Sequence, residues 1–234
     1  MPSRPELAVA GFYDGIYHFY EAANSFLTLG LDRYWRRRAA GKAREAFPGG
    51  CRALDVCCGT GDFALALKKA FGGGLELTGA DLSEAMLSSA ARKLPGVKLV
   101  KAEAKELPFP DGAFDLVTIA FATRNLNIDR DRLLAALREF RRVLKPGGLF
   151  LNLETTRPEN PAVRFLMRVH VKTLIALLNL ISPKSKTSYL FLRDTILGFY
   201  TVGEFSGLLR EAGFSSVSGS ALFPGAVAVH SGRA

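Results

Sequence analysis

The sequence predicts an α/β fold, in which a doubly wound, Rossmann-like sheet ends in an antiparallel hairpin. From residue 52 onward, short apolar runs alternate with segments of helical periodicity, and this alternation is typical of a parallel sheet covered by helices on both faces. The last two apolar runs, at 215–222 and 226–232, are joined only through Pro224 and Gly225. Because this connection is too short for a parallel crossover, these two strands should pair antiparallel.

The remaining elements can be placed in order along the chain. Strands are expected at 52–57, 75–81, 97–102, 114–122 and 149–154. Helices are expected at 61–71, 83–94, 129–144 and 205–214. Ser83 can cap the second of these helices, and Thr201 with Glu204 has the spacing of a capping box before the last. The third helix should stop at the Pro-Gly-Gly that follows Lys145.

One domain is expected to carry these elements. Residues 46–234 would form it, with an aromatic and helical cap at 1–45 and an insertion at about 159–192 that interrupts the alternation. A chain of 234 residues can bury a substantial core. Its three cysteines make no disulfide framework, and its N-terminus has no apolar run of signal-peptide length. A cytoplasmic protein is therefore expected.

The charge is strongly basic, with 31 Lys and Arg against 22 Asp and Glu, or +9. Such a balance suits nucleic acid, an anionic membrane surface or an acidic substrate. The basic residues are scattered except at 33–38, where no nucleic-acid-binding module surrounds them. We therefore expect peripheral contact with the inner face of a membrane, and no nucleic acid partner. We also expect that the chain can form a homodimer.

The stretch "LDVCCGTGD" places a glycine turn directly after the first strand. Its glycines, Gly59 and Gly61, allow a ligand to approach the backbone closely. Asp81 ends the second strand, twenty residues after Gly61, where it can accept hydrogen bonds from two ribose hydroxyls. This pattern fits NAD as well as S-adenosylmethionine. Two acids, Asp55 and Asp62, oppose the pyrophosphate of a dinucleotide at this helix N-terminus, and so favour S-adenosylmethionine.

Longer motifs give a resemblance to a known family. The segments "LDVCCGTGD", "GADLSEAML", "AEAKELPFPDGAFDLVTIAFATRNL" and "RVLKPGGLF" look like successive motifs of class I S-adenosylmethionine-dependent methyltransferases. Together with "YEAANSFLTLGLDRYWRR", "SYLFLRDTI" and "GAVAVHSG", they resemble the C-methyltransferases of menaquinone and ubiquinone biosynthesis. The resemblance implies C-methylation of demethylmenaquinol or a related polyprenyl benzoquinol. Another hydrophobic or phenolic acceptor is the alternative, and an NAD(P)-dependent oxidoreductase is a weaker one.

The resemblance also implies a set of residues that bind the methyl donor. They are Asp55, Gly59, Thr60, Gly61, Asp81, Leu82, Met86, Glu103, Ala104 and Ala120. Glu103 and Ala104 should lie beside the adenine. The family commonly has serine where this chain has Ala120, so a backbone contact is retained there and a hydroxyl contact is not. The chain also departs from the family at Glu21, at Pro224 and across 164–186, which puts the acceptor in doubt more than the cofactor.

The acceptor chemistry calls for a base, or for a positive group that stabilises a phenolate-like charge. Arg124 and Asn125 are the catalytic candidates for holding that oxygen, and Arg124 would act electrostatically because its pKa exceeds 12. The alternative for Arg124 is a structural pair with a carboxylate. His18 is a candidate base, as is His170, although isolated histidines are more often packed or surface residues. His230 is expected to be structural.

Two further features have alternative interpretations. Adjacent Cys57 and Cys58 have poor spacing for a metal, so no metal site is expected and both should be small turn residues. Segment 162–182 reads as a helix with Arg164, Arg168 and Lys172 on one face and mostly apolar residues on the other. Such a helix can lie on a membrane and admit a prenylated substrate. Equally, it can be a lid with a solvated basic face.

Overall fold

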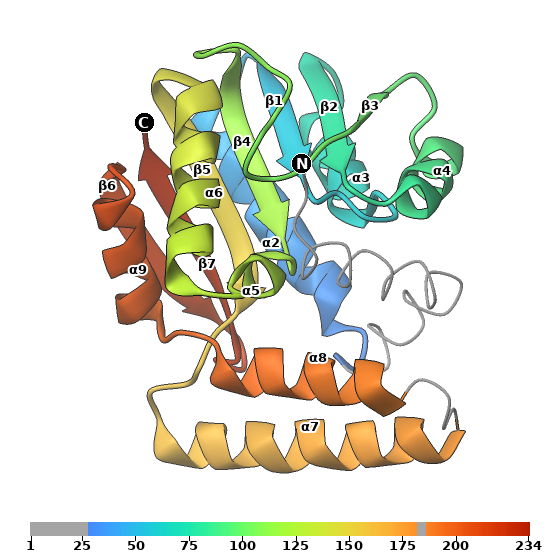
Figure 1. Ribbon diagram of the computed structural model, residues 1–234. Helices are drawn as coiled ribbons and strands as arrows, with labels where there is room; N and C mark the ends of the chain where they lie inside the picture. The colour runs from blue at the N-terminus through green and yellow to red at the C-terminus, as the bar shows by residue number, and fades with distance from the viewer. Residues whose placement is uncertain (1–27, 182–185) are drawn as a thin grey trace.

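The computed structural model describes residues 28–181 and 186–234. These residues form a seven-stranded sheet of order β3-β2-β1-β4-β5-β7-β6 (Figure 1). The strands are β1 (Cys51–Val56), β2 (Leu75–Asp81), β3 (Lys98–Lys101), β4 (Phe114–Ala120), β5 (Leu144–Thr155), β6 (Ser215–Leu222) and β7 (Val227–Arg233). Strands β1 to β5 pair in parallel, while β7 pairs antiparallel with both β5 and β6. The predicted parallel sheet with a terminal hairpin is confirmed.

The helices cover both faces of the sheet. They are α2 (Leu31–Ala46), α3 (Asp62–Phe71), α4 (Glu84–Lys93), α5 (Thr123–Leu126), α6 (Arg130–Val143), α7 (Pro161–Ile181), α8 (Lys186–Gly198) and α9 (Val202–Glu211). On one face, α6 and α9 contribute Leu137, Phe140 and Phe205 to a buried cluster. On the other, α2 and α3 contribute Trp35 and Leu67 to a second cluster. The sheet therefore has an apolar layer on each side, as a doubly wound fold requires.

Local sequence signals set several element boundaries as expected. The Ser83 hydroxyl accepts a hydrogen bond from the Met86 backbone N–H at 3.1 Å and caps α4. Thr201 and Glu204 form the predicted capping box at the start of α9, with bonds of 3.2 and 2.8 Å. Each cap satisfies N–H groups that the first helical turn would otherwise leave without partners.

Strand β5 is the main difference from the expected elements. It begins at Leu144, directly after α6, and not at Leu149. The Pro146-Gly147-Gly148 stretch forms an irregular segment within this strand. Phe114 pairs with Leu144 but Leu116 pairs with Leu149, so the register of β4 against β5 shifts across this segment. The short helix α5, between β4 and α6, was also not expected from the sequence.

The segment after β5 forms a helical hairpin of α7 and α8. Figure 1 shows it below the carboxyl ends of the strands, with α8 between α7 and the rest of the domain. Val171, Ile175, Tyr189, Leu192 and Ile196 form an apolar cluster of its own between the two helices. The hairpin covers most of 159–192, where the sequence alternation is interrupted, and continues to Gly198. No helix among the described residues is long and apolar enough to cross a bilayer.

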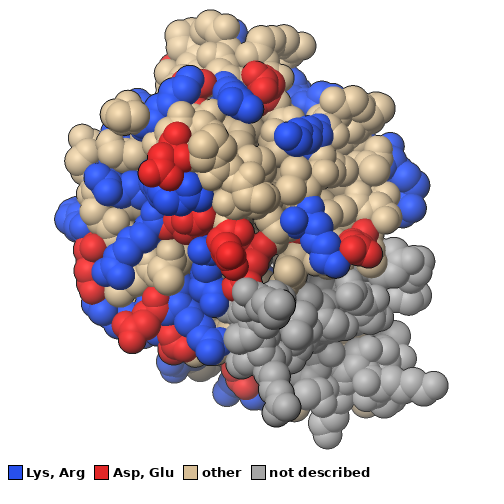
Figure 2. Space-filling view, turned by 45° about the horizontal axis from the view of Figure 1, so that its top comes forward, with Lys and Arg blue, Asp and Glu red and all other residues tan. Residues whose placement is uncertain are grey.

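Charged side chains on the face seen in Figure 2 are mixed in sign. Across the described residues, many charges are paired, for example Lys145 with Asp115 at 2.7 Å and Lys101 with Glu84 at 2.7 Å. The excess positive charge of the chain is therefore not gathered into a single field on this face.

Candidate functional site

A pocket lies at the carboxyl ends of β1, β2 and β4, where the strand order reverses. This is the position at which doubly wound sheets bind their ligands. Most residues of the predicted cofactor set line it: Asp55, Gly59, Thr60, Asp81, Leu82, Met86, Glu103, Ala104 and Ala120. The wall is completed by Arg36, Cys57, Cys58, Asp62, Phe63, Ser83, Ala102, Lys105, Phe121, Ala122, Asn125, Leu126, Ile128 and Arg132. Gly61 shapes the turn without lining the pocket.

The glycine turn needs glycine for two physical reasons. Gly59 and Gly61 have φ of 55° and 85°, in the left-handed region that other residues rarely adopt. A Cβ on Gly61 would also lie 2.7 Å from Leu94 Cδ1 at the end of α4. The second glycine is therefore required by helix packing as well as by the turn. Both features keep the backbone of the turn open to a ligand.

Asp81 connects the second strand to this turn. Its Oδ2 accepts a hydrogen bond from the Gly59 N–H at 2.8 Å, and its Oδ1 accepts one from the Ser83 N–H at 2.9 Å. Both carboxylate oxygens therefore fix the shape of the turn, and Asp81 also lines the pocket. Its expected ribose contact stays a prediction.

Asp55 is a buried acid at the end of β1. The Thr118 hydroxyl donates to its Oδ1 at 2.7 Å, while Oδ2 has no hydrogen-bond partner among the described residues. Burial raises the pKa of Asp55 to about 7, and the charge of Asp81 adds to this shift. The Thr118 bond, the charge of Arg36 and the nearby backbone N–H of Ala64 oppose it only in part. An oxygen of this kind fits a ligand that brings a cation or an N–H donor. The amino-acid tail of S-adenosylmethionine carries such an ammonium group.

The second acid of the turn behaves differently from the sequence expectation. Asp62 forms an ion pair with Lys93 of α4 at 2.6 Å, and the Lys93 ammonium also donates to the Thr60 hydroxyl at 3.3 Å. Asp62 therefore does not present an uncompensated negative charge to a ligand. Of the two acids that favoured S-adenosylmethionine over a dinucleotide, Asp55 is the one whose environment supports that preference.

Helix α2 supplies a wall that sequence reasoning missed. Arg36 is buried, forms an ion pair with Asp32 one turn earlier, and lies over the Phe121 ring with 5.2 Å from its guanidinium carbon to the ring centroid. Phe121 itself has a φ of 56° at the end of β4. The i, i+4 spacing of Asp32 and Arg36 was the available signal, because such pairs share one helix face.

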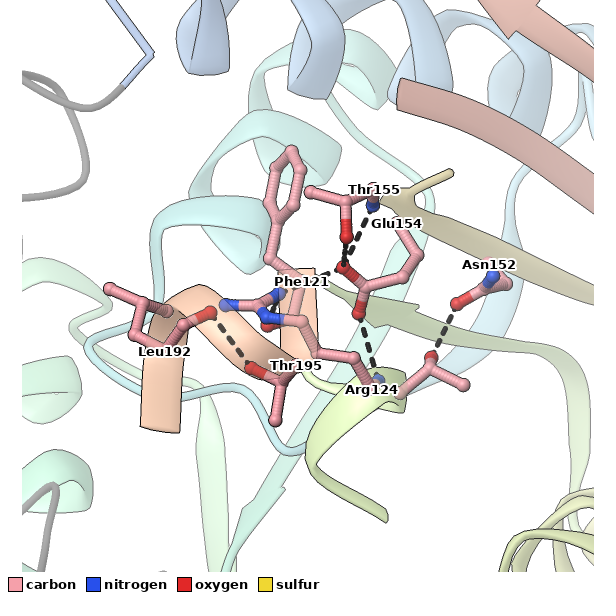
Figure 3. Close-up of polar contacts among 8 residues, drawn as sticks. Phe121, Arg124, Asn152, Glu154, Thr155, Leu192 and Thr195 are labelled. Atoms are coloured by element: carbon pink, nitrogen blue, oxygen red, sulfur yellow. Dashed lines mark hydrogen bonds and ion pairs between the residues drawn. The ribbon is translucent and has the colours of Figure 1, made fainter. Parts of the chain in front are cut away.

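Arg124 is buried and is not among the residues that line the pocket. Figure 3 shows its polar contacts with Glu154 and Phe121. Its Nη1 donates to Glu154 Oε1 at 2.8 Å and to the Phe121 carbonyl at 2.6 Å. Its backbone N–H donates to Glu154 Oε2 at 3.2 Å. Glu154 also accepts hydrogen bonds from the Thr155 N–H and hydroxyl at 2.8 and 3.0 Å. The guanidinium therefore ties the turn after β4 to the end of β5, which is the structural alternative expected for it.

Glu154 is the partner of Arg124 that could not be identified from the sequence. A signal was present, since a carboxylate ends the apolar run "LFLNLE" and a buried charge requires a partner. Asn125, one residue after Arg124, does line the pocket. Nearby, the Thr123 hydroxyl donates to Asn152 Oδ1 at 2.5 Å, which adds a second tie between α5 and β5.

Of the remaining candidates that the structure describes, His170 and His230 do not line the pocket. His18 and the N-terminal aromatics lie outside the described residues. His170 lies on α7, and His230 is buried in β7 beside the Phe205 ring, with 4.9 Å between centroids. Burial also raises the pKa of the Cys57 and Cys58 thiols well above the usual range, which keeps them as neutral thiols.

Comparison with known proteins gives a consistent match. Residues 2–234 match the sequence profile of the ubiE/COQ5 methyltransferase family. A Staphylococcus aureus (strain JH9) protein named demethylmenaquinone methyltransferase is 38% identical over 216 residues, which is 91% of this chain and 87% of that protein. The protein of that name in strain Newman gives the same values.

Solved structures show the same fold at lower identity. A SAM-dependent methyltransferase from Thermotoga maritima superposes with a TM-score of 0.61 and 23% identity, over 94% of this chain and 99% of that one. A second, from Aquifex aeolicus, has a TM-score of 0.55 and 19% identity, over 83% and 88%. At these identities the likeness establishes the class I methyltransferase fold alone.

Proposed function

The chain belongs to the ubiE/COQ5 methyltransferase family, and from this membership we propose that it methylates a ring carbon of a prenylated quinol. The acceptor we propose is demethylmenaquinol or a related polyprenyl benzoquinol, since relatives at 38% identity are named demethylmenaquinone methyltransferase. The family match decides for a methyltransferase over the oxidoreductase that the glycine spacing left open. Another hydrophobic or phenolic acceptor is the second candidate, because the segment that departs most from the family, 164–186, falls in the α7–α8 hairpin.

The single observation that carries the donor assignment is the buried Asp55 carboxyl with one oxygen lacking a described partner. We propose that this oxygen holds the ammonium of the donor's amino-acid tail, that Asp81 holds its ribose, and that Glu103 and Ala104 lie beside its adenine. S-adenosylmethionine, when bound, supplies an electrophilic methyl group on a positively charged sulfur. Apolar lining residues such as Met86, Ala120 and Phe121 suit such a group, because apolar side chains exclude competing water.

The acceptor side must orient a quinol and favour loss of its hydroxyl proton. Asn125 lines the pocket and offers an amide for the quinol oxygen. Arg124 acts as a positioning residue in this proposal, because Glu154 and the Phe121 carbonyl already engage its guanidinium. In this proposal the turn that contains α5 contributes to catalysis mainly by orienting the acceptor, since methyl transfer is helped mainly by orientation.

A quinol with a prenyl tail resides in lipid, so we also propose that the chain works in the cytoplasm and touches the inner face of the membrane peripherally. The homodimer expected from the sequence is a separate proposal, which analytical ultracentrifugation tests.

Labelled S-adenosylmethionine and chemically reduced acceptors test the function directly. We expect label in demethylmenaquinone reduced in detergent, with reduced demethoxy- and methoxy-benzoquinones assayed alongside. Asp81→Ala serves as the variant with a damaged donor site. Binding of S-adenosylhomocysteine with no label in any quinol would retain the donor site and overturn the acceptor. Lack of binding would overturn both.

A further inference from the structure

Helix α7 carries an exposed face that is mostly apolar, with Thr173 as the polar residue near its middle. Leu166, Val169, Leu177 and Leu180 are exposed at spacings that place them on one stripe, and Phe165 lies beside it. Phe165 is 66% exposed and Leu180 is 78% exposed. The side of the helix that packs on α8 is separate from this stripe, and uses Val171 and Ile175. The exposed face is therefore not a by-product of the hairpin's own packing.

The apolar side of α7 is divided between two environments. Leu166 is exposed, while Leu174 and Ile175, which the sequence places on the same side opposite the basic residues, are buried. The basic residues do not cover the outer face. They stand at its edge, where Arg168 and Lys172 are exposed. Arg164 is used locally, since it donates to the carbonyls of Pro158 and Glu159 at 2.8 and 3.0 Å.

The charge along α7 is of one sign. The helix has no Asp or Glu in its 21 residues. Arg168 and Lys172 form no ion pair with a described residue. An apolar stripe edged by free cations matches the boundary of an anionic bilayer, where apolar side chains enter the acyl region and cations meet headgroups. A second copy of α7 on the same face would instead bring like charges together, which opposes a two-fold contact.

The base of the hairpin is well anchored to the domain. Arg157 binds both carboxylate oxygens of Glu204 at 2.6 and 2.7 Å, and its backbone N–H donates to the Tyr200 carbonyl at 2.9 Å. The Tyr200 hydroxyl donates to Asn127 Oδ1 at 3.1 Å, just beyond α5. Contact made by α7 is thus connected through α8 and α5 to the pocket wall (Figure 1).

We infer that the outer face of α7 is the surface by which this chain docks on an anionic lipid bilayer, with the helix lying in the plane of the interface. The apolar stripe inserts at the headgroup boundary, and Arg168 and Lys172 contact lipid phosphates. Docking of this kind turns toward the membrane the end of the domain at which the carboxyl ends of the strands lie (Figure 1). Only its purpose, the capture of a lipid acceptor, rests on the proposed function.

Vesicle binding tests this inference without any turnover. The full chain is sedimented with vesicles of phosphatidylglycerol and phosphatidylcholine, and with phosphatidylcholine alone. Phe165→Asp/Leu180→Asp places two negative charges on the face. Lys69→Glu, at an exposed position of α3 away from α7, changes the net charge by the same amount. The double variant should lose about tenfold or more of its partition into anionic vesicles. The control should lose about twofold or less, because surface charge acts only within a Debye length.

Equal losses in the two variants would overturn the inference, because they would show attraction by net charge alone. Absence of wild-type binding to anionic vesicles would also overturn it. Sedimentation velocity without lipid identifies the competing occupant: a wild-type dimer that only the double variant dissociates would assign the face to a second copy. Unchanged affinity for S-adenosylhomocysteine confirms that the variants fold. A protein that binds vesicles by α7 but methylates no quinol would retain this inference and lose the proposed acceptor.

Discussion

Glu154 and Arg124 form a buried ion pair between the end of β5 and the turn after β4, with 2.8 Å from Oε1 to Nη1 and side chains 0% and 3% exposed. The pair fixes the turn from which Asn125 enters the pocket. Removal of one partner from such a pair leaves the other charge buried without compensation.

We therefore expect Glu154→Ala to lower the free energy of unfolding by about 3–5 kcal/mol. Glu154→Gln keeps acceptor and donor atoms near Arg124 and should cost less while still slowing methyl transfer. Urea unfolding and turnover at saturating donor measure the two effects. Glu159→Gln, an exposed acid in the following loop, is the control for the loss of one charge. If Glu154→Ala is as stable as the wild type, the ion pair does not stabilise the turn after β4.

Asp81 should carry a large part of the donor affinity. Asp81→Ala is expected to weaken binding of S-adenosylhomocysteine by about 1–3 kcal/mol, because charge-assisted hydrogen bonds to the ligand and to the Gly59 N–H are lost. Isothermal titration calorimetry measures it. Glu76→Gln, an exposed acid of the same strand, should bind as wild type does. Wild-type affinity in Asp81→Ala would refute its ribose role.

Asp55 should make donor binding depend on pH. Its pKa of about 7 in the free protein means that near neutral pH part of the protein carries a protonated Asp55, which must lose its proton when a ligand ammonium binds. Affinity for S-adenosylhomocysteine should therefore rise from about pH 6 to pH 8, with proton release on binding, and then level off. Calorimetry in buffers of different ionisation enthalpy detects the released proton. Asp55→Asn should bind weakly with a flat profile, and a flat wild-type profile would contradict the prediction.

His230 should make the fold sensitive to acid. Burial lowers its pKa from 6.5 to about 4, so the unfolded chain binds a proton at a higher pH than the folded chain does. Its contribution to stability is therefore present above about pH 6.5 and is lost as the pH falls toward 4. Thermal unfolding at pH 5 and pH 7.5 should differ less in His230→Gln than in wild type. Identical differences in both proteins would exclude His230 as the cause.

Asp55 shifts the pH dependence of stability in the opposite direction. Its pKa is raised from 3.8 to about 7, so its contribution is complete below the unfolded value and is lost as the pH rises through 7. The two buried groups thus partly cancel between pH 4 and 7. The single variants His230→Gln and Asp55→Asn are needed to separate the two contributions. In the wild type, the free energy of unfolding should change little with pH between 4 and 7.

The donor half of the molecule could be predicted from the sequence because its signals are local. The turn at Gly59 and Gly61 and the cap at Ser83 each depend on a few neighbouring residues, and the structure places them as expected. Partners distant in sequence were not visible. Lys93 lies 31 residues from Asp62, and Glu154 lies 30 from Arg124, so the electrostatics of both acids were misjudged or missed.

The α7 helix shows a second kind of limit. Helical periodicity identified its apolar and basic positions, but not which side would meet the protein. Packing against α8 determines which side of α7 is buried, because Tyr189, Leu192 and Ile196 of α8 cover Val171 and Ile175. A helix with apolar residues around most of its circumference has no sequence signal for which stripe is left exposed.

The separate cluster between α7 and α8 has a consequence for how such a chain can diversify. Its five buried residues pack on one another, while the donor site is held by two other clusters on the faces of the sheet. Substitutions within this cluster should therefore act first on the packing of the hairpin, and reach the pocket only through the contacts of Arg157 and Tyr200 at its base. We expect a chain of this kind to accept a different hairpin, and so a different acceptor, while the residues that line the donor pocket stay the same.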